Sequence, residues 1–309
     1  MITTVTLNPM LDKTVHLDSL ERGKIHRAPK LEMVAGGKGI NVSRQLKRLG
    51  IETVATGFLG GEIGTIVRSL LDREGIHHDF IATDVMTREG ITYLESDGTR
   101  TAVFEPTGRI PEHCVDELRK KVRELVKRSS WILCSGSSPC PEADDFYRQA
   151  ILSAREAGVK SVLDSYGEAF RLGVGAIPTL IKPNKDEYRQ TFGRDFRTEK
   201  ELQTKMDEWL KAGIEYVILT DGANPAYAAS SSGRWKIDAP SVKSVNPVGS
   251  GDAMMAGLVY GFEQAWTFEQ CLAFGAAAGA ANARTWDVAR SSLEEITSLQ
   301  QQVNITTLR

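Results

Sequence analysis

Short β-branched runs and amphipathic segments alternate through most of this 309-residue chain. The strand-like runs are 2–7, 52–60, 131–136, 161–165, 179–184 and 216–222. Segments with apolar residues at helical spacing are 39–50, 64–75 and 144–158. Strands joined by helices of this length predict right-handed crossovers and a mostly parallel sheet covered by helices on both faces. We therefore expect an α/β fold.

Two stretches interrupt this alternation. Residues 12–35 and 88–108 read as short paired strands, and the second contains Asp97-Gly98, a hairpin signal. Such strands predict a separate small sheet, which we interpret as a lid over the main sheet. From Gly249 onward the chain reads as helices, and no repeat or linker divides it. We expect one domain over residues 1–309, with the lid formed by about 12–35 and 88–108.

Charge and composition exclude several classes of protein. The formal charge is −2, so no global field favours nucleic acid or an anionic membrane. No apolar run reaches the roughly 18 residues of a membrane span, and the N-terminus "MITTVTLNP" reads as a strand rather than a signal peptide. The four cysteines have no C-x-x-C spacing, which indicates neither a metal site nor a disulfide framework. We expect a cytoplasmic protein.

The stretch "VNPVGSGDAMMAG" at 245–257 is the first candidate site. Val245-Asn246 ends a strand-like run, and Gly249-Ser250-Gly251 leads into a helix from about Asp252. Free N–H groups and the partial positive charge of a helix start hold phosphate well. An alternative is that Asp252 only complements the helix dipole. The glycine-rich loop before it argues for a ligand.

The sequence contains no G-x-x-x-x-G-K-[ST] loop, and no G-x-G-x-x-G follows the first strand. A nucleotide P-loop and a Rossmann dehydrogenase are therefore not indicated. A carboxylate beside an anion-binding helix start can accept a proton from an attacking hydroxyl, while the N–H groups stabilise the transferring phosphoryl group. This combination predicts a phosphotransferase site.

Two further clusters point to anionic ligands. In "AGGKGINVSR" (35–44) three glycines, Lys38 and Asn41 open a helix; the alternative is a tight turn with an exposed lysine. In "IKPNKDEY" (181–188) Asn184 and Glu187 have the spacing of a capping box. They equally suit Mg²⁺ or its waters, with Lys182 directed at phosphate.

Together these motifs resemble the ribokinase-like, or phosphofructokinase-B, family of carbohydrate kinases over essentially the whole chain. The motifs occur in the family's order: "NPMLD", "GGKGINVSR", "GFLGGEIG", "SGSSP", "KPNKDE" and "NPVGSGDAMMAG". The "NP-x-x-D" start, the "GGKGINV" loop and Thr87-Arg88 are most similar to the branch of hexose-phosphate kinases that contains 1-phosphofructokinase, tagatose-6-phosphate kinase and the minor 6-phosphofructokinase.

The resemblance implies a role for each matching residue. Asp252 is then the catalytic base, and the N–H groups of Gly249, Ser250 and Gly251 form the anion hole. Asn184 and Glu187 organise Mg²⁺ through water, while Lys182 contacts the phosphates of ATP. The remaining nucleotide positions are Thr220, Gly222 and Asn282, the last near adenine. The sugar-contacting positions are Asp12, Gly37, Lys38, Asn41 and Ser137, and the positions for the substrate's own phosphate are Arg88 and Lys24. The resemblance also implies a homodimer through the lid, in which a lid residue reaches across the interface.

The resemblance therefore predicts an ATP- and Mg²⁺-dependent kinase that phosphorylates a primary hydroxyl of a ketohexose phosphate. Fructose 1-phosphate and tagatose 6-phosphate are the favoured substrates, followed by fructose 6-phosphate. Four residues depart from the family pattern near the sugar and nucleotide sites: Gly90, Ser138, Pro141 and Pro225; Asp221 also lies in the nucleotide loop. Two alternatives stay open, a kinase of an unphosphorylated sugar or nucleoside and a non-catalytic sugar-sensing protein.

Overall fold

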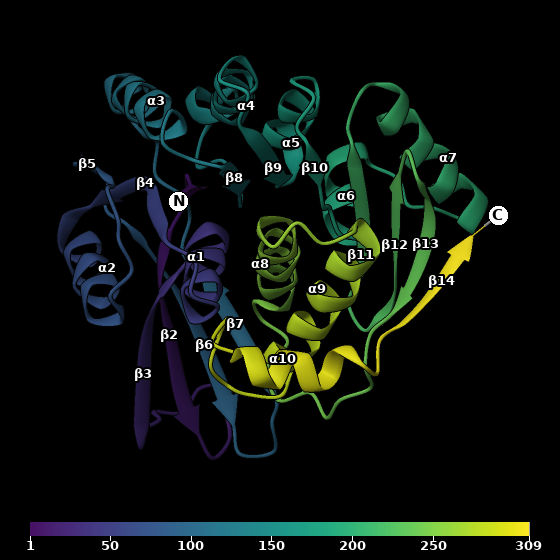
Figure 1. The fold of residues 1–309 in the computed structure, drawn as a ribbon. Helices are drawn as coiled ribbons and strands as arrows, with labels where there is room; N and C mark the ends of the chain where they lie inside the picture. Colours follow the sequence, from purple (N-terminus) through teal and green to yellow (C-terminus); the bar gives the residue numbers. More distant parts are fainter. Residues whose placement is uncertain (309) are drawn as a thin grey trace.

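The computed structural model describes residues 1–308 and contains one large sheet and one small sheet (Figure 1). The large sheet has ten strands, in the spatial order β14 (Asn304–Leu308), β13 (Gly233–Asp238), β12 (Asn224–Ser230), β11 (Tyr216–Asp221), β10 (Leu180–Ile181), β9 (Lys160–Asp164), β8 (Trp131–Ser135), β1 (Ile2–Thr6), β4 (Thr53–Gly60) and β5 (Ile81–Thr83). From β11 to β5 the strands are parallel, and from β11 to β14 they are antiparallel. The predicted α/β class with a mostly parallel sheet is confirmed.

Strand β8 shows why helices cover both faces of this sheet. Its residues alternate between two apolar clusters: Ile132 and Cys134 belong to one, and Trp131 and Leu133 to the other. The first cluster includes residues of α3 (Glu112–Val126), α4 (Phe146–Glu156), α5 (Gly167–Val174), α6 (Lys185–Phe192) and α7 (Glu199–Lys211). The second includes residues of α1 (Lys38–Arg48), α8 (Ser250–Glu263) and α9 (Phe268–Ala283). In Figure 1, α3, α4 and α5 lie on one side of the sheet and α1, α8 and α9 on the other.

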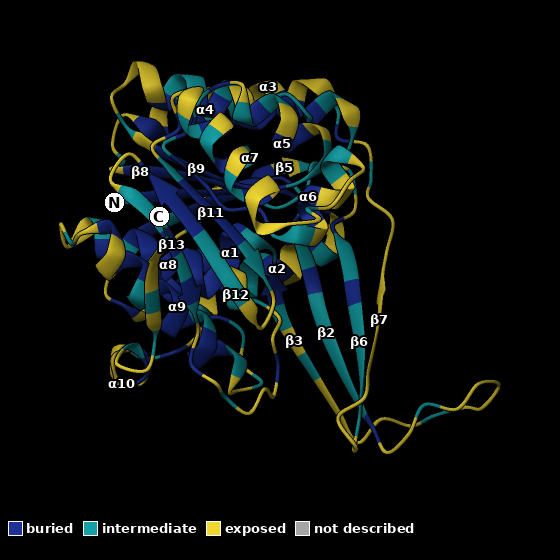
Figure 2. Ribbon diagram, turned by 90° about the vertical axis from the view of Figure 1, so that its right-hand side faces the viewer, coloured by how far each residue is buried: buried dark blue, intermediate teal, exposed yellow. Residues whose placement is uncertain are grey.

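The small sheet has the strand order β3 (Lys30–Gly36), β2 (Met10–Leu17), β6 (Arg88–Glu95) and β7 (Arg100–Phe104). Its central strands β2 and β6 are parallel, and both edge strands are antiparallel to them. Figure 2 shows it projecting from the main body, with exposed residues toward its far end. The helix α2 (Gly61–Glu74) packs its buried Val67 and Leu71 against Leu11 and Ala35 at its base. The prediction of a separate small sheet is confirmed.

The antiparallel edge of the large sheet was not predicted from the sequence. The last segment was expected to be helical throughout, but β14 follows α10 (Leu293–Gln300) and pairs with β13. Short turns join β11 to β12 and β12 to β13, and three consecutive helices precede β14, so the strand–helix alternation that identified the other strands is absent there. Within residues 1–308, none of the helices has the length and apolar character needed to cross a membrane.

Candidate active site

The candidate site lies beyond the carboxyl ends of the parallel strands of the large sheet. Asn8 follows β1, Ser137 follows β8, Asp164 ends β9 and Lys182 follows β10. From β1 the chain adds β4 and β5 on one side, and from β8 it adds β9 and β10 on the other side. Ligands of α/β sheets bind where the strand order reverses in this way. Across this point the side-chain amide of Asn8 donates to Ser137 Oγ at 3.1 Å. Asn8 was not singled out in the sequence.

The glycine-rich loop precedes α8, which begins at Ser250, two residues earlier than expected. Gly249 has φ 79°, and a Cβ there would lie 2.4 Å from Val288 Cγ1, so no side chain fits. The Ser250 N–H donates to the Pro247 carbonyl oxygen at 3.1 Å. Within residues 1–308 the N–H groups of Gly249 and Gly251 have no acceptor, so they are available to an anion.

Asn282 braces this loop. Its Nδ2 donates to the Val248 carbonyl oxygen at 2.9 Å and to Ser250 Oγ at 3.1 Å, and its Oδ1 accepts from the Ala289 N–H. The side chain is 1% exposed. Its polar atoms therefore hold the loop, and the prediction that Asn282 lies near adenine stays a prediction.

The residues before the loop also differ from expectation. Val245 and Asn246 end no strand; both backbone N–H groups donate to the Ala283 carbonyl oxygen, at 2.7 and 3.2 Å. The Asn246 side chain accepts from Arg100 Nη1 at 3.2 Å, which connects the small sheet to this segment.

Asp252 lies in the first turn of α8 and is 5% exposed. Burial raises its pKa to about 6, although Lys38 opposes the shift. Asn41 Nδ2 donates to Asp252 Oδ2 at 2.8 Å, and Arg44 Nη1 donates in turn to Asn41 Oδ1 at 2.7 Å. The Asn41 amide, which was expected to contact sugar, is thus bonded to the candidate base. Arg44 also forms an ion pair with Glu74. Neither residue was predicted as part of the site, because only the fold brings Glu74 to Arg44 and Arg44 to Asn41.

Two lysines and two carboxylates form a buried cluster beside Asp252. Lys38 Nζ donates to Asp164 Oδ1 at 2.8 Å and also to Glu187, while Lys182 Nζ is 3.2 Å from Asp164 Oδ2. Burial opposes ionisation of Asp164, but Lys182 and Lys38 outweigh it and hold its pKa below the ordinary value. Lys38 was expected to contact sugar, and the structure directs it to carboxylates instead. Asp164 was missed, although "SVLDS" places an acid at a strand end.

Asn184 and Glu187 form the capping box of α6. The Glu187 N–H donates to Asn184 Oδ1 at 2.8 Å, and the Asn184 N–H donates to Glu187 Oε2 at 2.9 Å. This bears out the structural alternative for the pair and leaves Glu187 Oε1 facing Lys38.

The described residues therefore offer few ligands for a metal ion. Within residues 1–308, no group of three or more His, Cys, Asp or Glu side chains is placed to hold one. The buried carboxylates of Asp164 and Glu187 still fit Mg²⁺, because Mg²⁺ takes one or two carboxylates and completes its shell with substrate phosphates and water. Such an ion suits a site where nucleotide phosphates supply the remaining oxygens.

Lys182 connects this cluster to the anion loop. A Cβ at Gly251 would lie 3.3 Å from Lys182 Nζ, so the ammonium group lies directly over the start of α8. Thr220 and Gly222 lie at the same edge: the Thr220 N–H donates to the Pro183 carbonyl oxygen at 3.2 Å, and Thr220 forms an isolated parallel bridge with Asn184. The predicted nucleotide positions are therefore brought together around the start of α8, and Asn282 joins them through its hydrogen bonds to the anion loop.

On the sugar side, Asp12 and Arg88 come from adjacent strands of the small sheet. Burial raises the pKa of Asp12 to about 6, and Arg88 and Arg44 partly offset it. Gly36 lies directly against Asp12: a Cβ there would lie 2.4 Å from Asp12 Oδ2, so a side chain would displace the carboxylate. Gly37 follows it at the start of α1.

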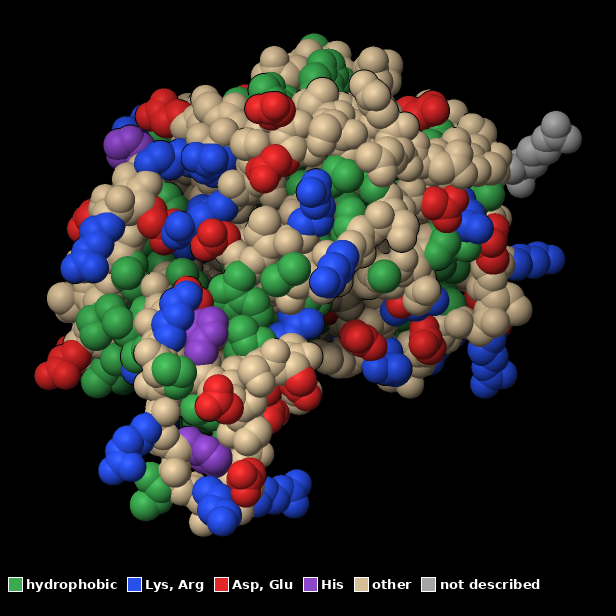
Figure 3. All heavy atoms as spheres, turned by 90° about the horizontal axis from the view of Figure 1, so that it is seen from below, with side chains coloured by type: hydrophobic (Ala, Val, Ile, Leu, Met, Phe, Trp, Pro, Cys, Tyr) green, Lys and Arg blue, Asp and Glu red, His purple; other side chains and the backbone are tan. Residues whose placement is uncertain are grey.

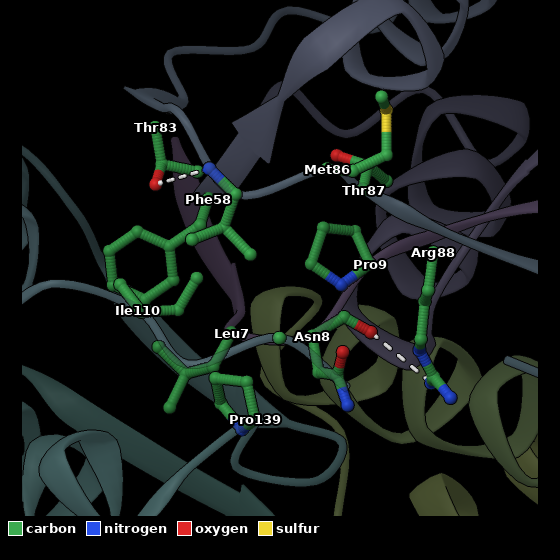
Figure 4. Close-up of a pocket in the computed structure, with 12 residues that line it drawn as sticks. Leu7, Asn8, Pro9, Phe58, Thr83, Met86, Thr87, Arg88, Ile110 and Pro139 are labelled. Atoms are coloured by element: carbon green, nitrogen blue, oxygen red, sulfur yellow. Dashed lines mark hydrogen bonds between the residues drawn. The ribbon is translucent and has the colours of Figure 1, made fainter. Parts of the chain in front are cut away.

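Arg88 is half-buried, and its guanidinium group makes few hydrogen bonds to the protein. Its Nη2 donates to the Asn8 carbonyl oxygen at 3.5 Å, and its buried Nε has no partner. Within residues 1–308 it forms no ion pair. Figure 4 shows it beside a small pocket, with a cavity volume of about 20 Å³, whose lining also includes Leu7, Asn8, Phe58, Thr87, Ile110 and Pro139. An unpaired guanidinium at such a cavity is suited to a phosphate.

Lys24 is not brought to this site. It lies in the exposed segment between β2 and β3, at the far end of the small sheet. Within one chain it contacts none of the other predicted site residues.

The departures from the family pattern have local explanations. A Cβ at Gly90 would lie 2.8 Å from Phe104 Cδ1, so the Phe104 ring occupies the space that a side chain at this position would need. Ser138 Oγ donates to the Cys140 carbonyl oxygen at 2.9 Å, and Pro141 opens the short 3₁₀ helix η1 (Pro141–Ala143).

In the nucleotide loop, Asp221 pairs with Lys185 at 2.6 Å. Pro225 lies near an irregular register between β11 and β12, where its missing N–H costs no ladder hydrogen bond.

Comparisons with known proteins agree with this geometry. Residues 5–295 match the family described as pfkB family carbohydrate kinase. The chain is similar to a tagatose-6-phosphate kinase of Staphylococcus epidermidis, at 31% identity over 310 residues and 99% of each chain. It is also similar to the structure of a possible 1-phosphofructokinase from Thermotoga maritima, with TM-score 0.91, 25% identity and coverage of 100% and 99%. A tetrameric inhibited form of phosphofructokinase-2 from Escherichia coli matches with TM-score 0.89, 25% identity and coverage of 97% and 98%.

Proposed function

This chain belongs to the pfkB family of carbohydrate kinases, and we propose that it transfers the γ-phosphate of ATP to a primary hydroxyl of a ketohexose phosphate. The favoured acceptors are fructose 1-phosphate and tagatose 6-phosphate, followed by fructose 6-phosphate. The names of the similar proteins, a tagatose-6-phosphate kinase and two phosphofructokinases, support a phosphorylated sugar as the acceptor.

The observation that carries the proposal is the buried carboxylate of Asp252 beside the free N–H groups of Gly249 and Gly251. Asp252 accepts the proton of the sugar hydroxyl as that oxygen forms its bond to the γ-phosphorus. The bond to the β-phosphate oxygen breaks, and ADP leaves with its electrons. The loop N–H groups and Lys182 hold the negative charge of the transferring phosphoryl group. Ser250 contributes through its place in the loop, because its own N–H is bonded to Pro247.

Magnesium, when bound with ATP, neutralises phosphate charge. In this chain Glu187 Oε1 and Asp164 would hold it, with Asn184 fixing the position of Glu187 through the capping box. Thr220 and Gly222 border the nucleotide at the same edge of the sheet.

The substrate's own phosphate is assigned to Arg88, whose buried Nε lacks a partner. Asp12, Gly37 and Ser137 line the sugar side. We also propose that residues 1–309 act as one kinase domain with the small sheet as its lid.

Lys24 belongs to this phosphate site only if the lid of a second copy supplies it. The outer face of the small sheet supports a homodimer, because Leu31, Met33 and Val103 are 52%, 44% and 56% exposed there. Figure 3 shows hydrophobic side chains open to solvent among charged ones on the side of the molecule where this sheet projects.

The test is a screen for sugar-dependent ADP release with MgATP against phosphorylated and free sugars and nucleosides. We expect turnover with at least one ketohexose phosphate. Turnover only with a free sugar or nucleoside would assign the chain to the other kinase class. Sugar binding by calorimetry with no ADP release from any acceptor would instead identify a non-catalytic sensor.

A further inference from the structure

Lys38 makes an unexpected contact for a residue of a glycine-rich ligand loop. It is the first residue of α1, and its side chain reaches across the sheet edge to Asp164 at the end of β9 and Glu187 in the first turn of α6. The side chain of Lys38 is 27% exposed, whereas those of Asp164 and Glu187 are 0% and 8% exposed. The Lys38 ammonium group thus lies between the solvent and the buried carboxylates of Asp164 and Glu187.

Lys38 contacts one oxygen of each carboxylate, and the buried Asp164 Oδ2 has no hydrogen-bond partner. Glu187 Oε2 is committed to the capping box, and Asp164 Oδ2 faces Lys182 at 3.2 Å. Asp164 Oδ1 and Glu187 Oε1 both face Lys38 Nζ. Carboxylate oxygens of this kind are also ligands that a divalent cation prefers. The ammonium group and the cation therefore require the same atoms.

We propose that Lys38 occupies the place of the divalent cation in the nucleotide-free enzyme, so that Asp164 and Glu187 accept the metal only when nucleotide phosphates draw the ammonium group away. This inference rests on the proposed function, because it assumes that metal and nucleotide act at this site. It assigns Lys38 to control of metal binding rather than to contact with the sugar.

The charges of the cluster support such an exchange. Asp164, Glu187 and Asp252 outnumber Lys38 and Lys182 by one charge, so the nucleotide-free cluster is nearly neutral. A dication entering without phosphate would have to displace Lys38 or lie beside its like charge, which costs free energy in a partly buried site. Nucleotide phosphates beside Lys182 and Gly251 provide an alternative partner for the ammonium group, whose flexible four-carbon stem allows it to move.

The test measures binding of Mn²⁺ to the whole, nucleotide-free protein by electron paramagnetic resonance. In Lys38→Met the carboxylates lose their internal counter-ion, and we expect Mn²⁺ to bind at least about tenfold more tightly than in the wild type. Lys38→Gln is a second neutral variant that can still donate to a carboxylate, and it should bind Mn²⁺ more tightly in the same way. Lys185→Met is the matched control, because it removes a nearby positive charge that pairs with Asp221; its affinity should equal that of the wild type.

An unchanged Mn²⁺ affinity in a folded Lys38→Met or Lys38→Gln protein would overturn the inference. The wild type provides a separate test that needs no Lys38 variant. Without nucleotide, the wild type should bind Mn²⁺ no more tightly than Glu187→Gln does. If the wild type instead binds Mn²⁺ clearly more tightly and Glu187→Gln abolishes that binding, Lys38 does not occupy the cation site. The proposed function fails on a different readout, which is absence of sugar-dependent ADP release by the wild type.

Discussion

The side-chain amide of Asn41 donates a hydrogen bond to Asp252 Oδ2 at 2.8 Å, and it is itself held by Arg44 at 2.7 Å. This contact joins the glycine-rich loop of α1 to the first turn of α8, which are far apart in sequence. It fixes which oxygen of Asp252 remains for a substrate hydroxyl. The two most informative motifs of the sequence therefore form one unit rather than two ligand loops.

Removing Arg44 should loosen this unit without removing a group that touches substrate. We expect Arg44→Met to lower kcat about tenfold with little change in the KM for ATP, because Asn41 loses its fixed orientation. Arg44→Lys keeps the charge and should recover part of the loss. Steady-state kinetics with the sugar identified by the screen provide the measurement. An unchanged kcat in Arg44→Met would show that Asn41 needs no support from this side.

The pH dependence of activity follows from the raised pKa of Asp252. A general base must be ionised, so kcat/KM should fall below about pH 6, where the buried carboxylate takes up a proton. Asp12 has a pKa of about 6 as well, so the profile should be repeated in Asp12→Asn. If the acid limb disappears in that variant, the limb belongs to Asp12 rather than to Asp252.

The free energy of unfolding should fall as the pH rises through 6, whereas the activity should increase. Burial raises the pKa of Asp252 from 3.8 to about 6, so the ionised carboxylate destabilises the folded state. The stabilising contribution of the protonated Asp252 side chain is complete below about pH 4, and it is lost as the pH rises through 6. Asp252→Asn should therefore exceed the wild type in unfolding free energy by up to about 3 kcal/mol at pH 8. Urea unfolding at pH 8 and pH 4 measures this difference, which should vanish at the lower pH.

The unpaired guanidinium of Arg88 predicts a specific effect on substrate affinity. Arg88→Ala removes charge-assisted hydrogen bonds that are made equally before and during reaction, so KM for the sugar phosphate should rise about 10- to 100-fold with little change in kcat. Arg88→Lys should be intermediate, because it keeps the charge but loses the fork geometry. Equal KM values for wild type and Arg88→Ala would indicate an unphosphorylated substrate.

Much of this architecture was accessible from the sequence, for identifiable reasons. The parallel strands were predicted because β1, β4, β8, β9 and β11 are short apolar runs with helices between most of them. The strand predicted at 179–184 is the short β10, whereas β5 and the antiparallel edge were missed, since three residues or a polar hairpin strand show no clear periodicity.

The site was predicted less completely than the fold. Motifs indicated Asp252, Lys182 and Glu187 as site residues; Lys182 and Glu187 follow β10, whereas the strand expected before Asp252 is absent. They could not show that Asn282 braces the anion loop or that Lys38 contacts Asp164, because those contacts depend on side-chain direction. Arg44 and Glu74 lie outside the predicted contacts altogether.

The most direct test of the account is sugar-dependent ADP release by Asp252→Asn. The asparagine keeps the size and polarity of the side chain but cannot accept the hydroxyl proton. With binding of ATP retained, as measured by calorimetry, turnover should fall by a factor of about 100 to 10,000 with the best sugar phosphate. Turnover of Asp252→Asn near the wild-type rate would contradict the assignment of Asp252 as the base.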